Sequence, residues 1–505
     1  MTMTNAAAGR SGTSDLMLAA ARTHPLAAIM LLAAAIRLPL ALWPNFHHPD
    51  EMFQYLEPAW RMLGHDGIVS WEWREGMRSW LLPGMMAGPV VLGDWLVPGG
   101  MGAFILPRLV VAMASLSIVV SAWAFGARVS RTHAVVAGFV AAIWFEFVYF
   151  APHTLGEPLA TAVILPAALL LTREAPSQRD LLGGGALLAL AVLFRFQYAP
   201  AVATLAICAC WQHHSRIFPI MAGGVAILVV SAAVDAAHGA VPFIWLVANI
   251  RQNLLYDRAS EFGVMPATAY IDCFWSMWSI ALVPLVFAVL RGWRHAPMLL
   301  WAALVNVAFH SLIGHKEYRF IFLSVVLLVI IAALGSVDWM LTLRSKPRCR
   351  RLAVPLIVGG WIGISAVLAA TGSMPEYWLR GIGAAKLASE LRAGSQMCGL
   401  ALYDAPYTLL TGKDRLAGNA PMFVLYSTDP LAAGHLAATA STASPAFNRI
   451  LAHRSMEKAL PPNFTRRGCE SVGSSEVCIY ARGGGCDAAA AASFTINDVL
   501  ARVGL

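Results

Sequence analysis

The chain contains little charge. Of its 505 residues only 13% are charged, whereas a soluble domain carries roughly 25%. Hydrophobic residues make up 58% of the chain, and the mean hydropathy is +0.64. This composition excludes a soluble globular protein and a disordered chain, and it is typical of a polytopic membrane protein.

Two further absences narrow the class of membrane protein. The sequence has no internal repeat, although many transporters are built from repeats that bind substrate near the bilayer midplane. It also has no CxxC motif and no Cys/His cluster in the sequence that suggests a metal site. We therefore predict a protein without a bound metal. A transporter or lipid flippase is the alternative class of protein, and the missing repeat argues against it.

Long apolar runs are abundant. A helical span needs roughly 20 mostly apolar residues, and we predict eleven spans, some of them short. They lie at 26–43, 103–125, 134–150, 157–172, 181–195, 198–211, 217–236, 274–290, 297–312, 319–342 and 353–371. The run 239–249 is too short to span and is expected at the interface. The first run contains Arg37 and lacks a small-x-small cleavage site, so we expect it to be retained.

The net charge of +8 gives the orientation. Lys and Arg gather in one set of short connections, which the positive-inside rule makes cytoplasmic. The excess is therefore an orientation signal and does not call for a nucleic-acid partner. The predicted organisation is a cytoplasmic tail (1–25), a transmembrane domain (26–371) with large external loops at 44–102 and 237–273, and an external C-terminal domain (372–505).

The C-terminal region has a different composition. Short β-like runs at 399–403, 422–426 and 477–480 predict a small α/β domain that packs over the membrane part. Structural cover and substrate binding are equally compatible with it. Cys398, Cys469, Cys478 and Cys486 all lie here, and an external location permits disulfides. Four cysteines allow three pairings, and the sequence does not choose among them.

Charged side chains cluster in the first external loop. Asp50 and Glu51 follow a span directly, where carboxylates are costly unless they are solvated or functional. The purely structural alternative is a solvated pair of carboxylates in which Asp50 begins a helix. Further on, 71–80 interleaves aromatic, acidic and basic residues, which suits a sugar but also fits an interfacial aromatic belt.

A second cluster lies at 314–320, before a later span. His315 and Arg319 are four residues apart and share a helix face. Such a group can cradle a lipid-linked phosphate, although Lys316 and Arg319 could also extend to lipid headgroups. Single charges at the predicted external ends of other spans are Arg37, Arg195 and Glu157; the last could simply complement a helix dipole.

These segments resemble glycosyltransferase family 22, the lipid-linked α-mannosyltransferases of the GT-C superfamily. The resemblance covers roughly 35–371. It rests on HPDEMFQYLEPAW at 48–60, WEWREGMRSW at 71–80, FRFQYAP at 194–200 and HKEYRFIF at 315–322. The segment 261–267 departs from the family pattern because it lacks a His and a Trp.

The resemblance implies a GT-C fold and transfer of a hexose, most often mannose, from a polyprenyl-phosphate donor. The acceptor would be a hydroxyl of a lipid-linked or cell-envelope glycan. The form of the chain resembles bacterial members, which implies an inner-membrane enzyme with a periplasmic active site. Neither a cofactor nor a metal is expected, because protein cations would neutralise the leaving phosphate.

We assign roles to residues on this basis. Asp50 is the expected general base of an inverting displacement, and Glu51 orients the acceptor or Asp50, or the two roles are exchanged. The expected donor-phosphate ligands are His315, Lys316 and Arg319, with Arg195 or Arg37. The expected sugar and acceptor contacts are His48, Gln54, Trp71, Trp73, Glu75, Arg78, Glu157 and Glu317.

Overall fold

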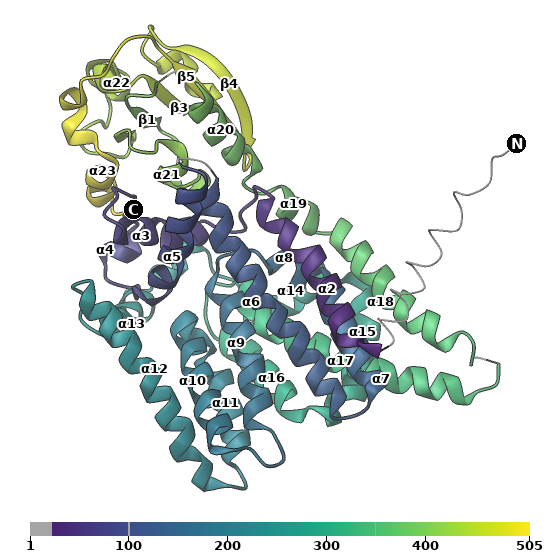
Figure 1. The fold of residues 1–505 in the computed structure, drawn as a ribbon. Coiled ribbons are helices and arrows are strands. Elements are labelled where there is room, and N and C mark those ends of the chain that lie inside the picture. Colours follow the sequence, from purple (N-terminus) through teal and green to yellow (C-terminus); the bar gives the residue numbers. More distant parts are fainter. Residues whose placement is uncertain (1–22, 99–100, 349, 395) are drawn as a thin grey trace, which may run out of the picture.

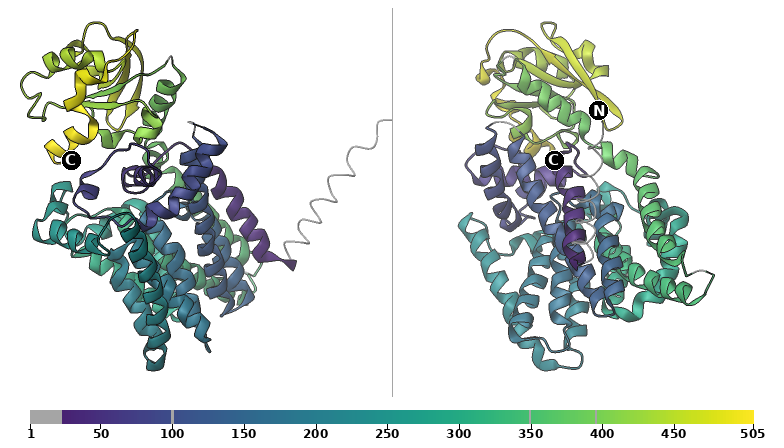
Figure 2. Two further views of the ribbon diagram at one scale, coloured as in Figure 1. Left: turned by 60° about the vertical axis from the view of Figure 1, so that its left-hand side comes forward. Right: turned by 45° about the vertical axis from the view of Figure 1, so that its right-hand side comes forward.

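The computed structural model describes residues 23–98, 101–348, 350–394 and 396–505. A bundle of helices forms the larger part, and a compact domain formed by the C-terminal residues stands on one of its ends (Figures 1 and 2). We call this end of the bundle the domain end and the other the far end. Most of the predicted N-terminal tail (1–25) lies outside the described residues.

The bundle consists of apolar helices, and each of the eleven predicted spans falls on one helix or on consecutive helices. The helices are α2 (Pro25–Arg37), α6 (Gly102–Ala127), α7 (Arg131–Ile143), α8 (Phe145–Phe150), α9 (Gly156–Leu171), α10 (Gln178–Phe194), α11 (Ala199–Cys210), α12 (Ile217–Ala237), α14 (Ala269–Trp278), α15 (Leu282–Gly292), α16 (Pro297–Ser311), α17 (Phe322–Ser345) and α18 (Ala353–Ala370).

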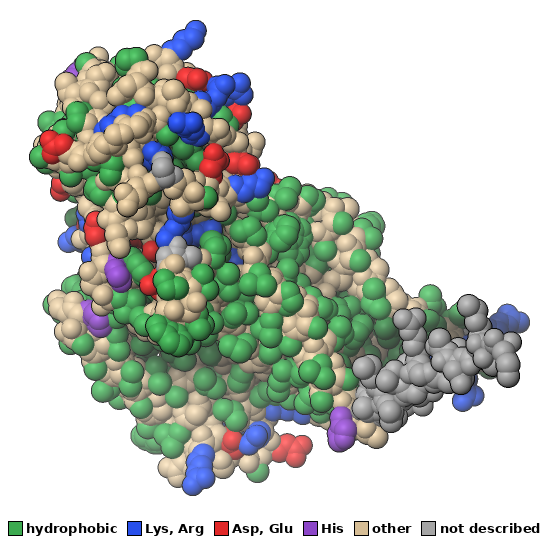
Figure 3. Space-filling view, turned by 45° about the horizontal axis from the view of Figure 1, so that its top comes forward, with side chains coloured by type: hydrophobic (Ala, Val, Ile, Leu, Met, Phe, Trp, Pro, Cys, Tyr) green, Lys and Arg blue, Asp and Glu red, His purple; other side chains and the backbone are tan. Residues whose placement is uncertain are grey.

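Short 3₁₀ turns extend several of these helices: Leu38–Leu42, Phe196–Tyr198, His214–Arg216, Ser279–Ala281, Trp293–His295 and Tyr318–Ile321. Within the described residues, six of the resulting segments are long and apolar enough to cross a membrane, and five further apolar helices have 10–17 residues. Hydrophobic side chains cover the visible face of the bundle, whereas charged side chains gather on the C-terminal domain and at the far end (Figure 3). The predicted polytopic helical membrane fold is confirmed.

The central helix of the bundle is α17. Its most apolar window is 89% buried inside the protein, and helices α7, α9, α15, α16 and α18 surround it. The contact with α15 is especially close, since a Cβ atom built on Gly335 would lie 2.0 Å from the carbonyl oxygen of Ala288. Only glycine permits this approach of the two backbones.

The first predicted loop contains more helix than expected. It holds a π-helical turn over Glu51–Leu56 and the helices α3 (Glu57–Met62), α4 (Trp71–Arg74) and α5 (Leu81–Leu96). The helix α5 packs on α6 and exposes Met85, Val91, Leu92 and Trp95. Proline and glycine interrupt this run, so its sequence does not look like a span. In the second loop, α13 (Ile244–Ile250) falls in the run expected at the interface.

The C-terminal domain contains a five-stranded sheet in the order β2-β1-β3-β5-β4. The predicted runs correspond to β1 (Leu400–Tyr403), β2 (Met422–Leu425) and β5 (Ser475–Ala481). Two strands were missed, β3 (Arg449–His453) and β4 (Thr465–Val472), because both contain basic residues. Strand β3 pairs in parallel with β1, and β5 runs antiparallel to its neighbours.

Helices α20 (Ile382–Ala393), α22 (Leu436–Ala443) and α23 (Ile496–Val503) pack on this sheet. Helix α21 (Lys413–Leu416) packs on α20, and α19 (Met374–Leu379) packs on α18 of the bundle. The predicted small α/β domain is therefore confirmed, whereas the boundary at 372 stays a prediction. Helices α21 and α23 face the first loop of the bundle (Figure 1).

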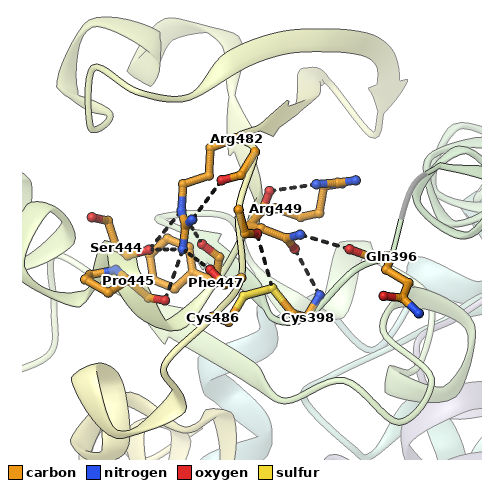
Figure 4. The surroundings of a disulfide bond; sticks show 12 residues. Gln396, Cys398, Ser444, Pro445, Phe447, Arg449, Arg482 and Cys486 are labelled. Atoms are coloured by element: carbon orange, nitrogen blue, oxygen red, sulfur yellow. Dashed lines mark hydrogen bonds between the residues drawn. A yellow bond between two sulfur atoms is a disulfide. The ribbon is translucent and has the colours of Figure 1, made fainter.

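Two disulfides join the four cysteines of this domain. Cys398 pairs with Cys486, and Cys469 pairs with Cys478 across β4 and β5. Beside the first bridge, the Arg482 guanidinium donates to several backbone carbonyls of the segment 444–447 (Figure 4). The structure thus selects one of the three pairings that the sequence left open.

Candidate active site

The two sequence clusters meet at the domain end of the bundle. Asp50 precedes the π-helical turn, a type of distortion found frequently at functional sites, and Arg319 lies in the 3₁₀ turn before α17. Asp50 Oδ2 is 2.8 Å from Arg319 Nη2. The same guanidinium contacts Glu317 (Nε to Oε2, 2.7 Å) and Glu157 (Nη1 to Oε1, 3.3 Å). Arg319 is therefore a buried cation shared by three carboxylates.

A glycine positions Glu157 in this group. A Cβ atom on Gly156 would lie 2.4 Å from the carbonyl oxygen of Phe194, so only glycine lets the start of α9 reach the end of α10. This approach brings Arg195, the residue after α10, to 3.5 Å from Glu157 (Nη2 to Oε1). Glu157 thus lies between the guanidinium groups of Arg195 and Arg319.

Two histidines extend the group. His48 contacts Asp50 (Nδ1 to Oδ1, 3.1 Å) and lies 3.7 Å from Glu317 (Nε2 to Oε2). His315 contacts the other oxygen of Glu317 at 3.1 Å. The structure therefore brings together seven of the predicted site residues that the sequence distributes over four regions: His48, Asp50, Glu157, Arg195, His315, Glu317 and Arg319.

The charges of the group fix its protonation. Burial alone would raise the pKa of Asp50, but the charges of His48 and Arg319 bring it well below its usual range. The pKa of Glu317 is likewise lowered, because Arg319 and His315 outweigh the effect of its burial. The hydrogen bond to Glu317 raises the pKa of His315. Both carboxylates are thus ionised at neutral pH and act as acceptors.

A cavity lies beside this group. Gln54, Tyr55, Arg78, Arg195, Trp245 and Asn249 are among the residues that line it. Arg78 donates to Glu72 at 2.5 Å, yet the Nε atoms of Arg78 and Arg195 are buried without a hydrogen-bond partner. Two arginines thus line one partly apolar cavity, and each keeps an N–H without a protein partner, an arrangement that suits an anion attached to a lipid.

Glu51 lies apart from its neighbour Asp50. Its side chain is fully buried and accepts from His153 Nδ1 (2.9 Å), from the Thr154 backbone N–H (3.1 Å) and from that of His47 (2.6 Å). These partners hold the start of the first loop against the α8–α9 turn. The exchanged assignment, with Glu51 as base, has no support from this location, because an acceptor cannot reach a fully buried carboxylate.

Arg37 and Lys316 do not join the group either. Arg37 is fully buried in the bundle, where its guanidinium donates to the carbonyls of Ser115 and Ala141. Lys316 donates to the carbonyls of Ile313 and Met265, at 3.2 Å for the latter. Lys316 thus fastens the second loop, and neither cation faces Asp50.

The aromatic segment 71–80 contacts the second loop as well. The ring of Trp71 lies between the Arg258 guanidinium, 4.7 Å from its centroid, and the ring of Phe262 at 6.3 Å. Glu75 accepts from Gln252 at 2.7 Å. Trp73 packs on Trp80, and its indole N–H is buried without a partner. Of the aromatic residues expected to bind sugar, Trp71 therefore contacts the second loop and stays partly exposed.

The sequence analysis missed several residues that support the group. His153 holds Glu51, and Tyr55 lines the cavity. The buried Glu146 accepts from Tyr318, the neighbour of Arg319, and from the indoles of Trp144 and Trp278. A carboxylate within the apolar run 134–150 was the available signal for Glu146, and a histidine four residues before Glu157 was the signal for His153.

Comparison with known families decides the class of the chain. Residues 28–374 match the model of the Alg9-like mannosyltransferase family. The chain belongs to this family. The predicted resemblance is thereby confirmed, and the matched range includes every residue of the group around Arg319.

Individual relatives of this Alg9-like family member are distant. GPI mannosyltransferase 3 of Yarrowia lipolytica is 29% identical over 325 residues, which cover 60% of this chain and 61% of the relative. GPI alpha-1,2-mannosyltransferase 3 of Bos taurus is 24% identical over 284 residues, or 54% and 52% of the two chains. The matched regions thus cover less than two thirds of these relatives.

Among solved structures, ArnT from Cupriavidus metallidurans superposes with a TM-score of 0.56. The comparison covers 92% of this chain and 100% of ArnT, at 14% sequence identity. The Alg9-like chain therefore has the expected GT-C fold, and at this identity the likeness shows the fold alone.

Proposed function

We propose that the protein transfers mannose from a polyprenyl-phosphate donor to a hydroxyl of a lipid-linked or cell-envelope glycan. Membership of the Alg9-like family supports the sugar, and relatives named as GPI mannosyltransferases support a glycan acceptor. The ArnT structure contains undecaprenyl phosphate, which supports a polyprenyl-phosphate ligand. The observation that carries the proposal is an ionised, partly exposed Asp50 held by Arg319 beside a cavity that two arginines with unpartnered Nε–H groups line.

In the proposed reaction, Asp50 accepts the proton of the acceptor hydroxyl. The hydroxyl oxygen bonds to the anomeric carbon, and the bond from this carbon to the phosphate oxygen breaks with inversion. Because the pKa of Asp50 is low, the proton moves late, when the bonding oxygen has become strongly acidic. His48 and Arg319 keep the carboxylate ionised, and Glu157 and Glu317 hold Arg319 in position beside it.

The leaving phosphate needs positive charge, since it departs as an anion. The charge of Arg319 is already matched by three carboxylates. We therefore assign the phosphate to Arg195 and Arg78, which line the cavity and whose Nε–H groups have no protein partner. Preorganised donors of this kind are effective in sites from which water is excluded.

The proposed location is a bacterial inner membrane, with the domain end on the periplasmic side. The distribution of Lys and Arg supports this orientation. The turn between β4 and β5 exposes Ser474, so a Ser474→Cys variant should react with a membrane-impermeant maleimide in intact spheroplasts. If labelling occurs only after permeabilisation, Ser474 lies on the cytoplasmic side and the proposed orientation is wrong.

The direct test is sugar transfer by purified Asp50→Asn protein with labelled polyprenyl-phosphate mannose and extracted cell lipids. We expect a loss of at least about 100-fold, the lower range for a general base. Asp272→Asn is the matched control, because Asp272 is exposed on α14 outside the group. Wild-type turnover by Asp50→Asn would show that Asp50 is not the general base. Lipid translocation without sugar transfer by the wild-type protein would favour a flippase.

A further inference from the structure

We propose that the far end of the bundle binds one Zn²⁺ ion through His133, His295 and Asp338. Each residue offers one ligand atom, and these atoms lie within 4.8 Å of one another. Among the described residues, this is the group of His, Cys, Asp or Glu side chains in which three ligand atoms lie close enough together to hold one metal ion. The candidate active site lies at the other end of the helices, so the two sites are separate.

The three ligands come from three places in the chain. His133 lies in the first turn of α7, His295 ends the 3₁₀ turn after α15, and Asp338 lies in the last third of α17. The two imidazoles approach the two oxygens of one carboxylate, with His133 Nε2 at 3.2 Å and His295 Nε2 at 2.9 Å. The sequence analysis could not detect this group, because its members are far apart in the sequence.

The backbone is built to hold His295 near Asp338. A Cβ atom on Gly292 would lie 2.2 Å from the carbonyl oxygen of Ile331. The close packing of α15 on α17 at Gly292 and Gly335 therefore fixes the turn that carries His295. His133 is buried, and its ring lies 5.2 Å from the ring of His295. The ligand geometry is thus set by helix packing and not by flexible loops.

The donor set suits Zn²⁺. Two imidazole nitrogens and one carboxylate oxygen are common ligands of this ion, and water completes its tetrahedral shell. His133 also has the outer partner that metal-bound histidines usually have, since its Nδ1 lies 2.8 Å from Ser130 Oγ. The nearest arginine on α15, Arg291, is directed to Thr342 and does not occupy the group.

Metal binding would change the tautomers of the two imidazoles in a defined way. Without metal, each of the two Asp338 carboxylate oxygens accepts a hydrogen bond from one of the two imidazoles. The ion would bind the Nε2 atoms in neutral imidazoles, whose protons move to Nδ1. In His133 the Nδ1–H would then donate to Ser130 Oγ. The metal thereby replaces two hydrogen bonds with three bonds that join α7, the α15–α16 connection and α17.

The test measures zinc in purified full-length protein that carries no polyhistidine tag. The protein is treated with chelator, equilibrated with Zn²⁺, desalted and analysed by inductively coupled plasma mass spectrometry. We expect about one zinc per chain and a Zn²⁺-dependent rise in Tm in the wild type. His295→Gln and Asp338→Asn should each lose at least tenfold of the zinc and show no such rise. Both substituted residues are partly exposed, so these variants should fold.

The double variant His213→Gln/His214→Gln is the matched control, because both histidines are exposed in another connection. It should retain the zinc and the Tm rise. Zinc that is lost in this control, or equal zinc in wild type and His295→Gln, would overturn the proposal. Zinc lost in Glu317→Gln but kept in His295→Gln would place the ion at the candidate active site instead.

Discussion

Arg319 and Asp50 form an ion pair, with 2.8 Å between Nη2 and Oδ2, that joins the two charged clusters of the sequence. Asp50 alone would be a carboxylate at a membrane surface, and Arg319 alone would be a buried cation. Together with Glu157 and Glu317 they form one network in which three carboxylates share the Arg319 guanidinium. The network fixes the carboxylate that we propose as base, and so its members should not be exchangeable for residues of equal charge.

The first prediction is that Arg319→Lys loses most activity and also stability. A lysine ammonium keeps the charge but lacks the planar fork that reaches three carboxylates at once. Leaving buried charges uncompensated costs about 3–5 kcal/mol, and we expect the retained charge to reduce this loss. Transfer rate and Tm in detergent measure the two effects.

Arg173→Lys is the control for this exchange, since Arg173 pairs with Asp180 at an exposed position. It should behave as the wild type in both measurements. Full activity in Arg319→Lys would mean that the site needs only a positive charge there, and the argument from geometry would fail.

The second prediction concerns pH and Glu57. Glu57 is buried between the first loop and the C-terminal domain, where it accepts from the Ile68 backbone N–H at 2.7 Å. Burial raises its pKa from 4.5 to about 7. A raised native pKa stabilises the fold below the pKa of the unfolded chain, and this contribution is lost as pH rises from about 4.5 through about 7. The free energy of unfolding should fall by roughly 3 kcal/mol over the full titration of Glu57.

The Tm of the wild type should therefore fall between pH 5.5 and pH 8, and the Tm of Glu57→Gln should change much less over this range. At pH 8 the variant should be the more stable of the two. Parallel pH profiles of wild type and variant would show that Glu57 does not titrate in this window.

The sequence predicted the elements whose signals are local. All eleven apolar spans correspond to helices because each carries its own hydrophobic run. Asp50, Glu317 and Arg319 were selected because charges next to spans are rare. Strand β4 was missed because basic residues and Cys469 occupy much of it, and its pairing depends on β5.

The sequence predicted the segments in which charged residues lie better than the directions in which their side chains point. Arg37, Lys316 and Glu51 occur in the expected segments, yet the structure directs them to carbonyls of α6 and α7, to the second loop and to His153. Which side chain of a charged cluster faces a cavity depends on tertiary packing, and neighbouring residues such as Asp50 and Glu51 can point to different environments. Their predicted roles at the substrate stay untested, and their locations do not support them.

The third prediction compares the disulfides. Cys398–Cys486 closes a separation of 88 residues and Cys469–Cys478 one of 9. The chain-entropy model then gives the longer bridge about 2 kcal/mol more stabilisation. Cys398→Ser/Cys486→Ser should lower the Tm of the C-terminal domain more than Cys469→Ser/Cys478→Ser does. Mass mapping of unreduced peptides checks both pairings, and an equal or reversed effect would contradict the ranking.

The last prediction tests how the C-terminal domain supports the first loop. Asn497 on α23 accepts from the Val69 backbone N–H at 2.9 Å and donates to the Gly67 carbonyl at 3.0 Å. Asn497→Ala removes both hydrogen bonds, at about 1 kcal/mol each, just before the helix that carries Trp71. We expect faster proteolysis within residues 64–70 and a several-fold lower transfer rate, whereas Asn463→Ala, at an exposed loop position, should change neither. If the loop becomes protease-sensitive while transfer is unaffected, the domain serves as structural cover and does not position the site.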